Sequence, residues 1–219
     1  MMRTSAARGL TGEYVISSEV VNPGPKTLKP GESATSAVVF TAREASAPKL
    51  EVNVDAEESA RRERIDSFLS KLRLETPDPV LKTAFAFAKI RTTESVYETK
   101  GGLMHGPGGG AYYAAIWAND QAEYANPFFA YTGYSTAVES AMTCWKLFGR
   151  WMNPAYKPIP SSIIAEGDSS WNFAGDRGDQ AMIAYGASRG ARALGNREKA
   201  KEIWPLIEWC LEYCRRKMN

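Results

Sequence analysis

The sequence predicts a mostly α-helical protein with a β-structured N-terminus. Residues 13–54 are rich in Val and Ile and are interrupted by Pro-Gly turns, which is typical of short strands. From residue 56 onward, apolar side chains recur at helical spacing, and long and short connections alternate. We therefore expect three parts: the C-terminal strands of a β-sandwich over 1–54, a linker helix over 55–76, and helical hairpins over 77–219.

Three strands are expected in the first part, over residues 13–21, 37–42 and 50–54. The second is a compact apolar run, and the third alternates apolar and polar side chains. Three strands leave an apolar face and edges uncovered, so we interpret them as part of a larger β-sandwich. The charge-rich helix that follows has a narrow apolar stripe and is expected to end before Pro77.

Five helices are expected after the linker, over residues 79–98, 119–132, 135–152, 176–194 and 196–218. Gly133 and Gly195 predict two short turns with left-handed C-caps. The other two connections, residues 99–118 and 153–175, are long. Successive connections between antiparallel helices lie at alternate ends, so both long loops are expected on one face. Long loops in compact folds are usually functional, and this face is the predicted site.

Composition and charge exclude several function classes. The net charge is +2 and the charged residues are mixed along the chain, so no nucleic-acid partner is expected. No apolar run is long enough to span a bilayer, and the first residues lack the apolar core of a signal peptide. The compartment of the parent protein, periplasmic or secreted included, stays open. With one histidine and three cysteines, we expect neither a catalytic Ser-His-Asp triad nor a metal site, and no cofactor.

The first long loop combines glycines with aromatic side chains and leads to a carboxylate. Tyr113 and Trp117 precede Asp120. Aromatic faces next to carboxylates suit sugar rings, which stack through their C–H groups and hydrogen-bond through their hydroxyls. The plainer alternative is that the aromatic rings pack in the core and that Asp120 is an N-cap or first-turn helix residue.

The second long loop gathers four carboxylates around Trp171, namely Glu166, Asp168, Asp176 and Asp179. Hydrolysis of a glycosidic bond needs two carboxyl groups, one as acid and the other as base or nucleophile. The plainer alternative is that Asp176 caps the following helix and that Arg177 pairs with a neighbouring carboxylate.

Three short motifs resemble segments of the six-hairpin glycosidases, which are (α/α)6-barrel glycoside hydrolases. Residues 116–120 (IWAND) resemble the IW-x-[RN]-D segment that opens the second barrel helix. Residues 166–173 (EGDSSWNF) are similar to the ESGWDFS-type loop of trehalase-like members, and residues 204–209 (WPLIEW) to an LWP…ALEW outer helix. The resemblance covers most of the chain. It implies a partial (α/α)6 toroid of about five helices, preceded by sandwich strands and a linker helix.

The resemblance also implies a function, namely that of a truncated glycoside hydrolase acting on the O-glycosidic bonds of an oligosaccharide or polysaccharide. The sugar would lie in a cleft at the N-termini of inner helices. The implied catalytic candidates are Glu166, Asp168 and Asp176, and the implied substrate-binding residues are Tyr113, Trp117, Asp120, Trp171 and Asp179. Asn172 stands where trehalase-like members have Asp, and an amide is no general acid, so the acid is one of the catalytic candidates or lies in a missing part.

Two other functions fit the same sequence features. One is a non-catalytic carbohydrate-binding protein that keeps the aromatic residues and lacks the acid pair. The other is a helical-hairpin scaffold of the solenoid type. Long Gly-rich loops argue against the solenoid, because solenoid repeats have a fixed period and short connections.

Overall fold

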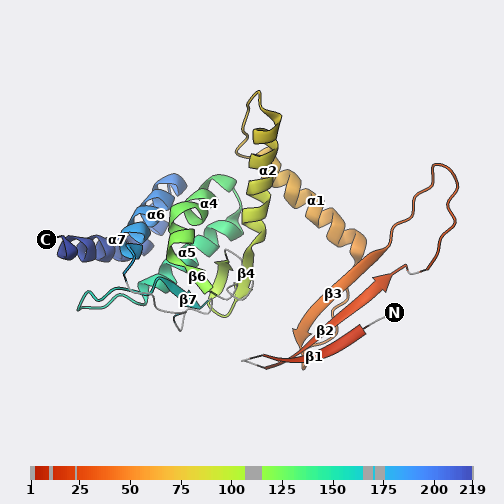
Figure 1. Cartoon of the computed structure of the whole chain (residues 1–219), viewed down its shortest axis with the longest axis horizontal. Coiled ribbons are helices and arrows are strands. Elements are labelled where there is room, and N and C mark those ends of the chain that lie inside the picture. The colour runs from red at the N-terminus through yellow and green to blue at the C-terminus, as the bar shows by residue number, and fades with distance from the viewer. Residues whose placement is uncertain are drawn as a thin grey trace. The chain divides into compact units, whose positions relative to one another are not determined.

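The computed structural model describes residues 3–9, 12–22, 24–106, 115–164, 170 and 176–218, without the side chains of residues 3–12. The chain divides into two compact units, Met1–Arg64 and Ile65–Asn219, and the boundary falls inside helix α1 (Val54–Ser70). Most of the chain is helical and a few small antiparallel sheets accompany the helices (Figure 1), which confirms the predicted class.

The first unit contains one antiparallel sheet in the order β1-β2-β3, coloured red to orange in Figure 1. Its strands are β1 (Arg3–Gly9), β2 (Gly12–Val21) and β3 (Ala37–Glu44). The strands expected over 13–21 and 37–42 are therefore confirmed, whereas the sequence did not predict β1. Cross-strand neighbours share a face, and one face of this sheet exposes four apolar side chains, those of Ile16, Val20, Val38 and Phe40.

The strand expected over residues 50–54 is wrong. Residues 45–53 are irregular, and α1 begins at Val54. Asn53 caps this helix, because its Oδ1 accepts a hydrogen bond from Ala56 N at 3.1 Å and its carbonyl accepts one from Glu57 N at 3.0 Å. An alternating pattern forms a strand only where a partner strand is present. Here the last residue of the pattern begins helix α1 instead.

The end of α1 is fixed by a buried lysine on helix α2 (Pro79–Glu94). The ammonium group of Lys89, a residue only 3% exposed, donates to the carbonyls of Phe68 at 2.8 Å and Leu72 at 3.1 Å, and also to that of Lys71. Carbonyls at and just beyond a helix end lack the usual helical donors, so the lysine supplies bonds there, in addition to the one that Phe68 O accepts from Lys71 N at 3.4 Å. The linker helix therefore ends at Ser70, earlier than expected.

Helix α2 ends at Glu94, before the expected residue 98, and is followed by a β-hairpin that the sequence did not predict. The hairpin pairs β4 (Val96–Thr99) with β5 (Gly102–His105) and packs against helix α5 (Ser135–Gly149). Val96 and Thr99 are β-branched and favour a strand once a partner is available.

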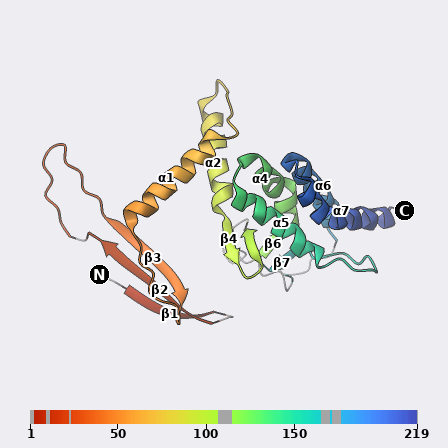
Figure 2. The same ribbon diagram turned by 180° about the vertical axis from the view of Figure 1, so that it is seen from behind.

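The remaining helices form two antiparallel hairpins (Figures 1 and 2). The first hairpin joins α3 (Ala118–Asp120), the π-turn η2 (Gln121–Ala125) and α4 (Asn126–Thr132) to α5; the second joins α6 (Asp179–Leu194) to α7 (Arg197–Lys217). Gly133 and Gly195 make the short turns in left-handed conformations, with φ of 64° and 63°, as predicted. Within the described part of the chain, no helix is long and apolar enough to cross a membrane.

The two hairpins lie side by side with α6 parallel to the α3–α4 segment. A methyl group added at Gly186 would lie 2.5 Å from Ala122 Cα, and one added at Gly190 would lie 3.7 Å from Pro127 Cα. Both chains therefore advance in the same direction along the contact. Only glycine permits so close an approach at Gly186, because any Cβ would overlap the backbone of η2.

The π-turn is held from the other side by His105, which is 5% exposed. Gln121 Nε2 donates to the His105 carbonyl at 2.8 Å, and Gln121 Oε1 lies 3.0 Å from His105 Nδ1. Because an amide oxygen only accepts, Nδ1 carries a proton and is the donor in this bond. Burial lowers the pKa of His105, although Gln121 and the charge of Asp120 oppose the shift.

The two glycines of α6 give a matched pair of predictions for stability. We expect Gly186→Ala to lower the free energy of unfolding by about 2–3 kcal/mol, because the new methyl group overlaps backbone atoms that cannot move separately. Gly190→Ala places its methyl group at ordinary contact distance and gains helix propensity, so it should be neutral or stabilising by up to about 1 kcal/mol. Urea unfolding of both variants measures this, and equal effects at the two positions would contradict the packing.

The buried histidine predicts a pH dependence of stability. The pKa of His105 lies below its ordinary value of 6.5 in the folded chain, so the unfolded chain binds this proton first as the pH falls. The free energy of unfolding should therefore decrease as the pH falls below about 6.5. Denaturant unfolding between pH 7.5 and 5.5 measures the slope. His105→Gln should remove it, since the sequence has no other histidine, and a slope that persists in this variant would contradict the assignment.

Candidate functional site

The two long loops are hydrogen-bonded to each other. β6 (Ala115–Trp117) pairs antiparallel with β7 (Ser162–Ile164), so that Trp117 lies opposite Ser162. The pairing continues beyond the strands, because Ala118 N donates to Ser161 O at 2.9 Å. The centre of the ladder joins Ile116 to Ile163, both fully buried in the core. The prediction that these loops meet is therefore confirmed for their described residues, whereas the expected approach of Asp120 to Glu166, Asp168 or Asp176 stays a prediction.

This face lies at the N-terminal ends of the two parallel helical segments. β6 leads directly into α3, and α3 packs against α6. In the first turn of α6, Gln180 Nε2 donates to Ile159 O at 3.1 Å. The segment that enters β7 is thus fastened to the start of α6 on one side and to the start of α3 on the other.

Three buried polar atoms beneath the loops have no hydrogen-bond partner among the described residues. They are Ser161 Oγ, Asp179 Oδ2 and Gln180 Oε1, on residues that are 4%, 2% and 1% exposed. An unpaired buried polar atom costs roughly 1–3 kcal/mol. Such atoms are uncommon in folded proteins and tend to occur where a ligand or ordered water completes the bonding.

Asp176 and Asp179 are only three residues apart but have opposite electrostatic environments. Burial raises the pKa of Asp179, although backbone N–H donors and the charge of Arg177 oppose the rise. Asp176 is exposed; its Oδ2 accepts from the Tyr213 hydroxyl and its Oδ1 from Gly178 N at 2.9 Å. These bonds lower the pKa of Asp176, with the Tyr213 bond the larger cause. Asp179 therefore keeps its proton to a higher pH than Asp176.

Of the plainer alternatives, the one for Asp176 as N-cap is wrong and the one for Asp120 as a first-turn residue is confirmed. The residue that caps α6 is Gly178, in a left-handed conformation with φ of 84°, so Asp176 is not the N-cap. Asp120 does lie in the first turn of α3, as the plainer alternative states. Its Oδ1 accepts from the Tyr124 hydroxyl at 2.7 Å, and this bond and burial raise the pKa of Tyr124 to about 12. Trp117, half-buried, is the last residue of β6.

Four predicted site residues lie outside the described part of the chain, namely Tyr113, Glu166, Asp168 and Trp171. Their roles stay predictions. Sequence reasoning missed Ser161, Gln180 and Tyr213, because no motif marks them. The spacing of Trp209, Tyr213 and Arg216 places them on one face of α7 and is the one signal that points to Tyr213.

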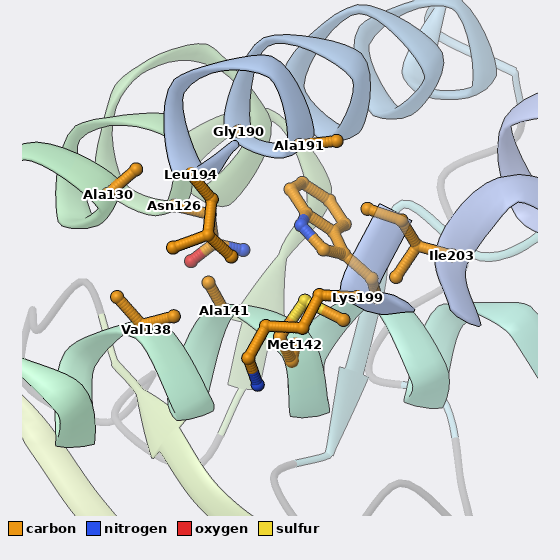
Figure 3. Close-up of a pocket in the computed structure, with 11 residues that line it drawn as sticks. Asn126, Ala130, Val138, Ala141, Met142, Gly190, Ala191, Leu194, Lys199 and Ile203 are labelled. Carbon is orange, nitrogen blue, oxygen red and sulfur yellow. The ribbon is translucent and has the colours of Figure 1, made fainter. Parts of the chain in front are cut away.

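A small hollow lies away from the loops (Figure 3). It has a volume of about 20 Å³ and is surrounded by α4, α5, α6 and α7. Gly190, in its wall, is about 16 Å along α6 from Asp179 at 1.5 Å per residue. The volume holds about one water molecule, so this hollow is far too small for a sugar. Asn126 lines it and has both amide atoms buried without a hydrogen-bond partner among the described residues.

Among the residues that the structure describes, no group of three or more His, Cys, Asp or Glu side chains is placed to hold a metal ion. Comparison with models of protein families, with curated proteins and with solved structures finds no match to this chain. Any function assigned to the chain therefore depends on its own residues and their geometry.

Proposed function

We propose that the loop face binds a sugar and that the chain is part of a glycoside hydrolase of the six-hairpin type. One observation carries the proposal. The two loops that bear aromatic and carboxylate residues are hydrogen-bonded together at the N-terminal ends of two parallel helical segments, next to buried polar atoms that have no partner among the described residues. Aromatic and carboxylate residues held together at one end of the helices suit a ligand with several hydroxyl groups.

The arrangement of the hairpins supports a partial (α/α)6 toroid. Such a ring needs successive hairpins whose inner helices run parallel, and here α6 runs parallel to the α3–α4 segment. In this proposal these two are inner helices, and α5 and α7 are outer ones. A helical scaffold also stacks parallel hairpins, but it does not require long loops joined in a sheet at one end.

The pKa shifts suggest a division of roles between the two described loop carboxylates. A general acid must keep its proton at the working pH, which favours the buried Asp179. Asp176 remains ionised to lower pH and suits a base or nucleophile. The proposal thus moves Asp179 from a substrate-binding role to the acid role, while Glu166 and Asp168 stay candidates for catalysis.

The neighbouring residues suit the binding of a sugar ring. Trp117 offers an aromatic ring at the end of β6, three residues before Asp120. Tyr124 donates to Oδ1 of Asp120, which leaves Oδ2 for a sugar hydroxyl. A carboxylate oxygen that accepts from a hydroxyl forms a charge-assisted hydrogen bond, among the stronger polar contacts.

Sugar binding is the direct test, because it does not require a complete set of catalytic groups. We expect neutral oligosaccharides to change the tryptophan fluorescence at millimolar concentration or below. Asp120→Asn should weaken the affinity by about tenfold, the effect of losing about 1.4 kcal/mol. Glu139→Gln, at an exposed carboxylate on α5, should leave it unchanged. A panel of glycans that leaves the emission unaltered would contradict the proposal.

Hydrolysis separates the catalytic function from the non-catalytic alternative. If the chain turns over aryl glycosides, Asp179→Asn should lower kcat by at least about 100-fold, because the variant has no acidic proton to donate. Undiminished turnover in this variant would exclude Asp179 as the acid. Sugar binding without turnover would favour a carbohydrate-binding protein that lacks the acid pair.

A further inference from the structure

The second long loop is held at both of its ends by α7. At its start, Trp209 Nε1 donates to Asn153 O at 3.1 Å, and the ring of Tyr156 stacks on Trp209 with centroids 5.2 Å apart and planes 9° apart. At its end, Asp176 accepts the hydrogen bond of the Tyr213 hydroxyl. The rings of Trp209 and Tyr213 are stacked as well, 5.7 Å apart. Three rings in a row therefore connect the start of the loop to Asp176.

The start of the loop is fixed in an uncommon backbone conformation. Tyr156 has φ of 49°, in the left-handed region that residues with a Cβ rarely adopt. Asn153 closes the turn around it, because its side chain accepts from Lys157 N at 2.8 Å and donates to Lys157 O at 2.9 Å. The Arg216 guanidinium lies 3.9 Å from the centre of the Tyr156 ring. A strained backbone conformation persists only where surrounding contacts stabilise it, and these contacts do so for Tyr156.

We infer that Tyr213 is the positioning residue for Asp176, and that the stack behind it holds the two described ends of the second loop. The inference rests on the proposed function, because that proposal gives Asp176 the role of base or nucleophile. Tyr213 is only 3% exposed and is wedged against Trp209, so its hydroxyl has little freedom to turn away from the carboxylate. A carboxylate on an exposed segment would otherwise sample several rotamers.

Among the described residues, the other charged and titratable groups that interact with Asp176 come from α6 and α7. Lys217 lies 5.7 Å from the centre of the Tyr213 ring and favours the ionised carboxylate. Cys214 and Asp179 also sense the charge of Asp176, which raises the pKa of each. Removing the Tyr213 hydroxyl leaves these groups in place, so the effect of the hydroxyl can be measured separately.

The test uses Tyr213→Phe in the whole chain, because Phe keeps the stack on Trp209 and loses only the hydroxyl. We expect the pKa of Asp176, followed by carboxyl ¹³C NMR, to rise toward its ordinary value of 3.8. The amide signal of Gly178, which bonds the other carboxylate oxygen, should shift in the same variant. Tyr185→Phe, at a half-exposed tyrosine on α6, should change neither.

Each outcome decides the inference without a sugar being present. An Asp176 titration that is the same in Tyr213→Phe and in the unmodified chain would overturn it. If Tyr213→Phe does not fold, the ring ¹³C signals of Tyr213 in the unmodified chain serve instead and should shift as Asp176 titrates. Tyr213 signals that do not follow this titration would count equally against the arrangement. Failure of the proposed function would appear separately, as the absence of sugar binding in the unmodified chain.

Discussion

The close approach of α6 to η2 at Gly186 determines how the two helical hairpins lie against each other. Backbone meets backbone there, so no side chain separates the two segments, and the contact at Gly190 fixes the direction as parallel. Parallel segments place their N-terminal ends together. The loops that precede α3 and α6 consequently emerge at the same end, where β6 and β7 pair. The position of the candidate site thus follows from helix packing, which depends on Gly186 and Gly190 of α6.

The start of α6 shows how position alone separates two identical side chains. Asp176 is exposed and receives two hydrogen bonds, and its pKa falls; Asp179 is buried, with one oxygen that has no partner among the described residues, and its pKa rises. Pairs of carboxyl groups whose environments push their pKa values apart are what acid–base catalysis needs. Structural ion-pair networks also shift pKa values, so the shifts gain meaning here from their place on the loop face.

Much of the helical unit follows from local pattern in the sequence. Apolar spacing gave the helices, Gly133 and Gly195 gave the short turns, and the alternation of loop lengths gave the common face. Features that depend on a distant partner were missed. The strand expected over residues 50–54 failed because Asn53 begins a helix, and β1 was missed because its partner β2 defines it. The spacing of apolar residues shows which side of a segment is apolar, but it does not show which other segment packs against that side.

The same distinction applies to the site. The sequence placed Asp120 and Trp117 at the entrance of a helix, where the structure has them. It could not show that Asp179 is buried, because burial depends on what packs against the start of α6 in the folded chain. It also could not show that Tyr213, on another helix, bonds to Asp176.

The most direct measurement of the central claim is a set of nuclear Overhauser contacts between α6 and the η2–α4 segment. The parallel packing predicts contacts from the Gly186 Hα protons to Ala122 Hα and from the Gly190 Hα protons to Pro127 Hα. Contacts that run in the opposite order along the two segments, or none between them, would contradict the arrangement of the hairpins and with it the common loop face.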